Sequence, residues 1–171
     1  MKQLLLSPYA LRHMHVILAA LLWAATLPAL AETELRCVVR SVHDGDSMRV
    51  QCPGERRTIA VRMHQIDAPE LEQPYGKDAR NHLRRLCRVG STATIYTQGR
   101  DQYGRLLGDV YCAGKSVNEE MVSSGSAWIY DRYVENRSLY RLQDRARANR
   151  RGLWAAQNPR APWRWRYEQR Q

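Results

Sequence analysis

The stretch Arg36–Cys52, which reads RCVVRSVHDGDSMRVQC, decides the fold that we expect for this 171-residue chain. It holds two segments rich in β-branched residues, Arg36–His43 and Ser47–Cys52, separated by the dipeptide Asp44-Gly45. An Asp-Gly pair between two such segments is typical of a tight β-hairpin. The sequence therefore predicts a sheet that begins with a hairpin, and this hairpin carries acidic residues at its tip.

Strand and helix patterns follow in a mixed order along the rest of the chain. Three more segments have strand character, namely Arg57–Ile66, Ser91–Thr97 and Arg105–Cys112. Helical spacing marks Tyr75–Val89, a short segment between Ser116 and Gly125, and Asn136–Arg151. Strands that meander, take in a helix and then resume are typical of a small Greek-key barrel. We therefore expect an α+β fold, with a five-stranded barrel of the oligonucleotide-binding (OB) type and about three helices.

The first 31 residues have the pattern of a secretory signal peptide. Basic residues precede an apolar run, Val16–Leu27, and small residues two apart, Ala29 and Ala31, follow it. A membrane anchor is the alternative, but the run is shorter than the ~20 apolar residues of a span and Pro28 interrupts it. We predict a signal peptide over 1–31, a globular domain over 32–154 and a Trp- and Arg-rich tail over 155–171. The protein is expected to be periplasmic or secreted, with no stable membrane anchor.

The four cysteines, Cys37, Cys52, Cys87 and Cys112, all follow this leader. An even number of cysteines in an exported protein favours disulfides, and their wide spacing argues against a zinc site. Cys37 and Cys52 are equidistant from the hairpin turn, so we expect them to face each other and to be bonded. Cys87 and Cys112 then remain as the second pair, with two reduced and buried thiols as the alternative.

The chain is strongly basic. It has 27 Lys and Arg against 17 Asp and Glu, a formal net charge of +10 and a pI near 9.9. Such a charge favours an acidic partner, either a nucleic acid or an anionic surface, and does not choose between them. Hydrophobic residues make up 44% of the chain, which suffices for a packed core and argues against wholesale disorder.

Three short clusters contain residues suited to phosphodiester cleavage. They are Asp44-Gly45-Asp46-Ser47, Arg62 with Asp67-Ala68-Pro69-Glu70, and Asp101-Gln102-Tyr103-Gly104-Arg105. Taken singly, each is an ordinary turn or loop. Taken together, they supply carboxylates for a hard cation, a glutamate that can act as a base and two guanidinium groups for phosphate oxygens.

These clusters, with further blocks in the same order, resemble the thermonuclease (staphylococcal nuclease-like) family in its exported bacterial form. The resemblance runs from about Cys37 to Trp154. The matching blocks are Val42–Asp46 (V-x-D-G-D), Arg62–Glu70 (R-x4-D-x-P-E), Asp101–Arg105 (D-x-Y-G-R), Tyr75-Gly76, Gly125–Trp128 and Arg151–Trp154.

The resemblance implies a Ca²⁺-dependent nuclease that acts on DNA and RNA and leaves 3′-phosphates. By position, Asp46 and Asp67 look like calcium ligands, and Ala68 looks like a third ligand through its backbone carbonyl. Glu70 looks like the general base that activates the attacking water.

The resemblance also implies residues that contact the substrate. Arg62 and Arg105 look like the pair that binds the phosphate and stabilises the transition state, and Tyr103 looks like a nucleotide contact. Gln102 departs from the pattern, because the best-known member has Lys there. The tyrosine that stacks on substrate aligns with either Tyr130 or Tyr133.

Two other functions compete with catalysis. One is a non-catalytic nucleic-acid-binding module of the same OB type, although such members usually lose the acidic and Arg positions that this chain keeps. The other is a basic envelope protein whose charge serves adhesion, which leaves the carboxylates unexplained. We expect DNA and RNA substrates, no protein partner and a monomer.

Overall fold

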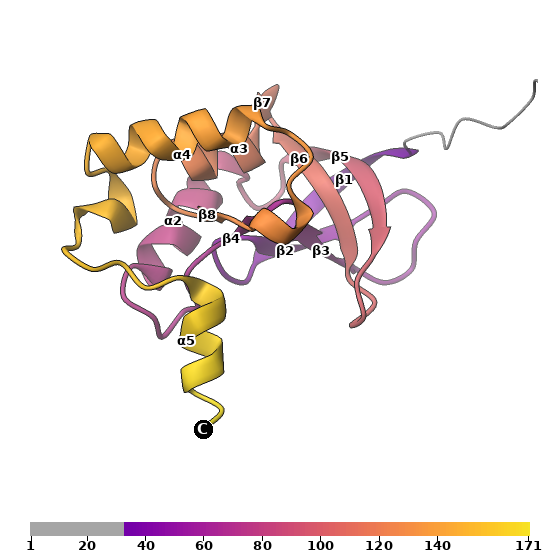
Figure 1. Ribbon diagram of the computed structural model, residues 1–171. Helices are drawn as coiled ribbons and strands as arrows, with labels where there is room; N and C mark the ends of the chain where they lie inside the picture. The colour runs from indigo at the N-terminus through magenta and orange to yellow at the C-terminus, as the bar shows by residue number, and fades with distance from the viewer. Residues whose placement is uncertain (1–32) are drawn as a thin grey trace, which may run out of the picture. The chain divides into compact units, whose positions relative to one another are not determined.

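The computed structural model describes residues 33–171, which Figure 1 shows in colour. The predicted signal peptide over 1–31 lies outside the described residues. Five strands form the centre of the fold, namely β1 (Thr33–Val42), β2 (Ser47–Gln51), β3 (Ile59–Met63), β5 (Thr92–Arg100) and β6 (Leu106–Cys112).

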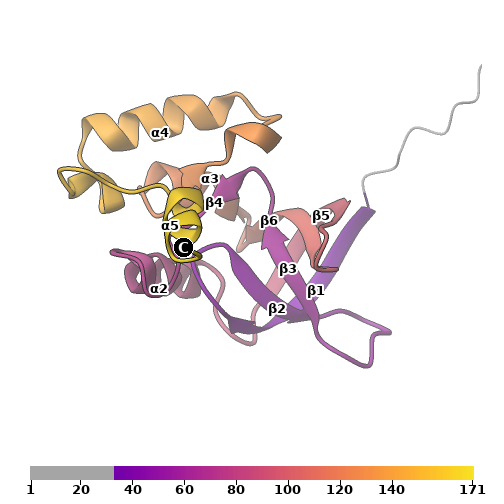
Figure 2. The ribbon, with the colours of Figure 1, turned by 60° about the horizontal axis from the view of Figure 1, so that its bottom comes forward.

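These five strands close into a barrel. Neighbouring strands are antiparallel in the order β3-β2-β1-β5-β6, and a parallel pairing of β3 with β6 joins the two ends. Figure 2 shows β3 and β6 side by side at this closure. The expected α+β fold with a five-stranded OB-type barrel is therefore confirmed.

Alternating side chains fill the barrel. Along β6, from Leu106 to Cys112, every second residue is buried and the residues between are partly exposed. β3 shows the same parity, because Val61 and Met63 are buried in the core while Arg62 between them points to the other face. The strand register thus directs the basic side chain of β3 out of the core.

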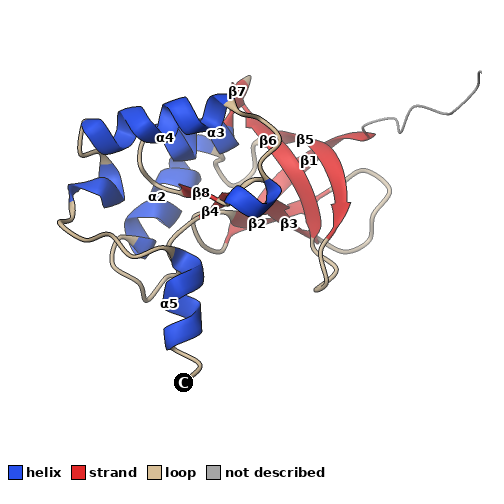
Figure 3. Ribbon diagram, viewed as in Figure 1, coloured by secondary structure: helices blue, strands red, loops and turns tan. Residues whose placement is uncertain are grey.

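Helices gather at one end of the barrel, as Figures 1 and 3 show. They are α2 (Gly76–Leu86), α3 (Val117–Ser123), α4 (Ser138–Ala148) and α5 (Pro162–Glu168), with the short 3-10 helices η2 (Asp131–Tyr133) and η3 (Gly152–Ala155). α2 buries Ala79 and Leu83 at the predicted helical spacing. Ser116 caps α3 by accepting a hydrogen bond from the Glu119 N–H. None of the described helices is both long and apolar enough to cross a membrane.

The structure differs from the expected elements in four places. The strand expected over 57–66 is divided, because Gln65 adopts a left-handed backbone (φ 66°) between β3 and the short strand β4 (Ile66–Asp67). β4 pairs with β8 (Trp128–Ile129) in a separate small sheet. β7 (Lys115–Ser116) pairs with β6. The tail contains α5, a helix that the sequence analysis did not predict, with Pro162 at its start.

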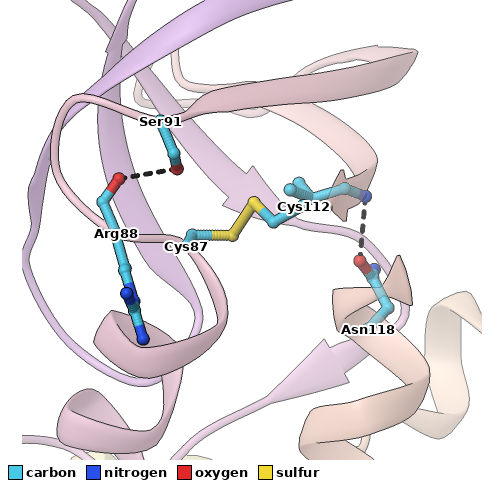
Figure 4. The surroundings of a disulfide bond; sticks show 6 residues. Cys87, Arg88, Ser91, Cys112 and Asn118 are labelled. Atoms are coloured by element: carbon cyan, nitrogen blue, oxygen red, sulfur yellow. Dashed lines mark hydrogen bonds between the residues drawn. A yellow bond between two sulfur atoms is a disulfide. The ribbon is translucent and has the colours of Figure 1, made fainter. Parts of the chain in front are cut away.

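Two disulfides connect the elements. Cys37 is bonded to Cys52 across the first hairpin, and Cys87 is bonded to Cys112. The second bond joins the end of α2 to the last residue of β6 (Figure 4). Beside it, the buried side chain of Asn118 accepts a hydrogen bond from the Val110 N–H at 3.0 Å and so connects α3 to β6.

We expect removal of the Cys87–Cys112 bond to cost slightly more stability than removal of Cys37–Cys52. The bonded residues are 25 positions apart in the first case and 15 in the second. The chain-entropy model gives about 3.5 and about 3 kcal/mol for these loops. Urea unfolding of the two double Ala variants measures both losses. A loss below about 1 kcal/mol for either pair would contradict this account.

His82 on α2 lies against the turn that follows α3. Its Nδ1 lies 2.8 Å from Ser126 Oγ and 3.0 Å from Ser124 Oγ. Burial is the largest cause that lowers the pKa of His82, and the charge of Arg85 acts in the same direction, against Glu120. The folded protein therefore holds this imidazole neutral more firmly than the unfolded chain does.

The free energy of unfolding should fall as the pH falls below about 6.5, the ordinary His pKa. The reason is that the unfolded chain then takes up a proton at His82 more readily than the folded protein does. Urea midpoints measured between about pH 5 and 8 test this, with His82→Asn as the comparison. The variant should lose this part of the pH dependence, and an unchanged pH slope would show that His82 does not contribute.

Candidate active site

The β1–β2 hairpin turn positions Asp46. Asp44 Oδ1 accepts a hydrogen bond from the Asp46 N–H at 3.0 Å, so Asp44 shapes the turn itself. A Cβ on Gly45 would lie 2.6 Å from Ala68 Cβ, so the turn reaches the Ala68 segment only because this position has no side chain.

β4 supplies Asp67, which is only 1% exposed. Gln65, two residues before Asp67, holds this segment against the part of the chain that leads into α4. Its carbonyl accepts from the Tyr130 N–H at 2.8 Å, and its Oε1 accepts from the N–H groups of Glu135 and Asn136 at 2.8 and 2.7 Å. The left-handed turn at Gln65 thus fixes where Asp67 lies.

Asp46 and Asp67 form a buried acidic pair. The Ala68 N–H donates to Asp46 Oδ2 at 2.6 Å. Arg62 Nη2 lies between the two carboxylates, 3.0 Å from Asp67 Oδ1 and 3.3 Å from Asp46 Oδ2. Burial is the main cause that raises the pKa of Asp46 well above its usual range, and Asp44 and Asp67 add to it while Arg62 opposes it. Two buried carboxylates around one guanidinium favour a further cation.

Arg62 is bound to its own segment as well as to the acidic pair. Its side chain is 12% exposed, and its Nη1 donates to the carbonyls of Met63 and Ile66 at 2.7 and 2.8 Å. The guanidinium therefore holds β3 and β4 in place around the carboxylates.

Glu70 lies in the loop that follows β4, with 39% of its side chain exposed. The Glu70 N–H donates to Gln73 Oε1 at 3.2 Å, and the Gln73 N–H donates back to the Glu70 carbonyl at 2.9 Å. Gly76, the first residue of α2, packs directly on this carbonyl, because a Cβ there would lie 1.7 Å from Glu70 O. The start of α2 therefore fixes the backbone that carries Glu70.

Arg105 and Tyr103 lie in the loop before β6. Arg105 Nε donates to Asp101 Oδ2 at 2.7 Å, and its guanidinium stacks on the Tyr103 ring at 5.6 Å. Burial acts against ionisation of Asp101, but hydrogen bonds from Arg105 and Tyr103 outweigh it and lower its pKa. Leu107 pairs with Arg62 in the parallel ladder, so Arg105 shares the outer barrel face with Arg62. Its ion pair is with Asp101 and not with the buried acidic pair.

Arg166 on α5 reaches the acidic pair from the other end of the chain, and sequence reasoning missed it. Its Nη2 lies 2.8 Å from Asp67 Oδ2, and its Nη1 lies 3.1 Å from Asp67 Oδ1 and 2.8 Å from Glu70 Oε1. Burial opposes the charge, but Asp67 and Glu70 outweigh it and raise the pKa of Arg166. The sequence signal that could have pointed to its helix is Pro162, because proline is favoured at the first position of a helix.

Aromatic side chains attach α5 to the domain. The Trp163 ring stacks on the Tyr130 ring with 5.7 Å between ring centroids. It meets the Trp128 ring edge-on with 5.6 Å between centroids. Tyr133 packs on Tyr130 at 5.1 Å. Tyr130, one of the two tyrosines considered for substrate stacking, is therefore covered by the tail, while Tyr133 is 47% exposed.

The donor set around the acidic pair fits a hard divalent cation. Two carboxylates lie close together there, one of them with a pKa raised by burial, and a backbone segment adjoins them at Ala68. Oxygen ligands of this kind suit Ca²⁺ or Mg²⁺. Over residues 33–171, no three His, Cys, Asp or Glu side chains form a ligand cluster, so backbone oxygen and water would complete the shell.

The chain matches a known family. The sequence model of the family described as "Staphylococcal nuclease homologue" matches residues 60–156. Arg62, Asp67, Glu70 and Arg105 fall within this segment, and Asp46 precedes it.

Three similar proteins come from bacteria and a plant. The chain is 42% identical over 131 residues to an "Uncharacterized endonuclease" of Escherichia coli, which covers 76% of this chain and 83% of that protein. It is 33% identical over 156 residues to an "Uncharacterized endonuclease" of Haemophilus influenzae, and the match covers 91% of this chain and 86% of that protein. It is 44% identical over 114 residues to a "Probable staphylococcal-like nuclease" of Oryza sativa subsp. japonica, and the match covers 67% of this chain and 31% of that protein. The chain thus spans about a third of the length of this plant relative.

We expect Gly76→Ala to destabilise the protein, although Ala normally favours a helix over Gly by up to ~1 kcal/mol. The added Cβ would overlap the Glu70 carbonyl, and overpacking of this kind costs about 1–3 kcal/mol. Urea unfolding measures the change, with Lys77→Ala at the next, exposed position as the control. A gain in stability for Gly76→Ala would show that the Glu70 loop is free to move.

Proposed function

Because the chain belongs to the staphylococcal nuclease family, we propose that it is an exported, Ca²⁺-dependent endonuclease that hydrolyses DNA and RNA with low sequence selectivity. The observation that carries this proposal is the meeting of Asp46 and Asp67 beside Glu70. The carboxylates of Asp67 and Glu70 approach closely enough for one guanidinium to bind both. Such an arrangement supports a cation site next to an accessible base.

The cation would be held by Asp46, Asp67 and the carbonyl of Ala68. When bound, Ca²⁺ supplies positive charge that neutralises a phosphate oxygen and makes phosphorus more open to attack. Asp67 and Asp46 are buried by the β1–β2 turn and β4, so their carboxylates are held in position before any ligand arrives.

Glu70 would act as the general base. Its carboxylate is 39% exposed, so water can reach it, whereas Asp67 is shielded. A water oxygen bonds to phosphorus while Glu70 takes one of its protons. The bond from phosphorus to the 5′-oxygen then breaks, solvent protonates that oxygen, and the 3′-phosphate product remains.

Arg62 and Arg105 would donate to the phosphate oxygens as charge builds up on them. Both lie on the outer face of the barrel beside the closing pair of β3 and β6. Planar guanidinium groups match two phosphate oxygens at once. Tyr103, 70% exposed and stacked on Arg105, would contact the nucleotide.

The remaining features agree with an exported protein that binds polyanions. Disulfides such as Cys37–Cys52 and Cys87–Cys112 persist in oxidising compartments, which supports a periplasmic or secreted location. The net charge of +10 suits a polyanionic substrate such as nucleic acid, and a single chain contains all the proposed catalytic groups. We propose that it acts as a monomer.

We expect Glu70→Gln to lower kcat by ~10²-fold or more, because the amide cannot accept the water proton. Hydrolysis of single-stranded DNA by the purified chain lacking residues 1–31, in millimolar Ca²⁺ and in a chelator, measures the rate. Glu72→Gln, which changes an exposed glutamate of the same loop, is the matched control. Intact DNA in the presence of Ca²⁺ would reject the enzyme and favour the non-catalytic binding module.

A further inference from the structure

The guanidinium of Arg166 lies where the proposed cation site and the proposed base meet. It donates hydrogen bonds to both carboxylate oxygens of Asp67, at 3.1 and 2.8 Å, and to one carboxylate oxygen of Glu70, at 2.8 Å. This paired geometry is the strong form of an Arg–carboxylate contact. Arg166 is 32% exposed, so solvent screens the pair only in part.

A divalent cation that binds Asp67 in this arrangement would have to compete with two guanidinium groups. Arg62 already bonds to Asp67 Oδ1, and Arg166 binds both Asp67 oxygens. A divalent ion at the same carboxylate would also stand within a few ångströms of the Arg166 charge, and like charges at that distance repel strongly in a partly buried site. The structure therefore makes Arg166 and the cation competitors for one carboxylate.

The rest of α5 and the residue Arg160 before it keep Arg166 in place. Trp163, one helical turn before it, packs on Tyr130 and Trp128. Gln73 Nε2 donates to the Arg160 carbonyl at 2.7 Å, and this same Gln73 bonds to the Glu70 backbone. The contact of Arg166 is thus one of several that join the tail to the Glu70 loop.

The direction of Arg166 argues against a role as an additional phosphate ligand. Its Nη1 and Nη2 atoms point at the carboxylates that would hold the cation and activate water. In this position Arg166 blocks those carboxylates. Trp163, on the same helix, covers the ring of Tyr130.

We propose that α5 is an inhibitory segment, in which Arg166 occupies the cation position and must leave Asp67 before Ca²⁺ binds. This inference rests on the proposed function, because it assumes that Asp67 is a cation ligand. Binding of Ca²⁺ then weakens the docking of the tail, and docking of the tail weakens the binding of Ca²⁺ to the same extent.

The test is calorimetric titration of Ca²⁺ into the purified chain lacking residues 1–31, without nucleic acid and at fixed ionic strength. Arg166→Gln should lower the Kd for Ca²⁺ by at least ~5-fold, since the competitor is gone. Arg164→Gln removes the same charge from an exposed position of the same helix and should leave the Kd unchanged. Trp163→Ala, which loosens the anchor of α5, should also lower the Kd.

Hydrogen exchange supplies the reciprocal measurement. Saturating Ca²⁺ should speed the exchange of the α5 amides that follow Pro162, those of residues 163–168, in the unmodified chain, because the bound ion displaces Arg166. Thermal unfolding shows whether each variant folds.

The outcomes separate the two proposals. Equal or weaker Ca²⁺ binding by Arg166→Gln, with normal binding by the unmodified chain, overturns the inhibitory role and leaves the cation site intact. A lower Kd for Arg164→Gln, equal to that of Arg166→Gln, also overturns it, since general charge would explain the change. Absence of Ca²⁺ binding in all variants overturns both the inhibitory role and the proposed calcium-dependent function.

Discussion

The burial of Asp46 and Asp67 is the constraint on which the rest of the structure depends. Two carboxylates with little exposure to water are costly unless cations and N–H donors surround them. Arg62, the Ala68 N–H and Arg166 meet this need in the described structure. The β1–β2 turn, the left-handed residue at Gln65 and the tail helix can each be understood as ways of assembling these partners.

The barrel provides the rigid support for this acidic pair. Closure of β3 onto β6 fixes the face from which Arg62 extends, and the Cys87–Cys112 bond joins β6 to the end of α2. The first residue of that helix, Gly76, packs on Glu70. A continuous path of packed backbone therefore connects the closed sheet to the proposed base.

The sequence predicted those parts of the fold and of the site whose structure depends on residues close together in the chain. The hairpin around Asp44-Gly45 was predicted, because a tight turn depends on neighbouring residues. The strand around Arg62 was predicted for a similar reason, since strand character is also a property of a short segment. The break at Gln65 was not readable, since a left-handed Gln carries no residue signal and is imposed by contacts with the segment before α4. Arg166 was missed because the tail around it is rich in Arg and Trp, and only tertiary packing distinguishes one Arg from the others.

The segment that matches the family ends at residue 156, and α5 begins at Pro162. The segment that matches the family and the helix that covers the acidic pair are therefore separate stretches of the chain. Under the proposed inhibitory role, changes in the later stretch would alter how much calcium is needed for activity while the barrel and its carboxylates stay the same. The same enzyme core would then suit surroundings of very different calcium content through changes in one short helix.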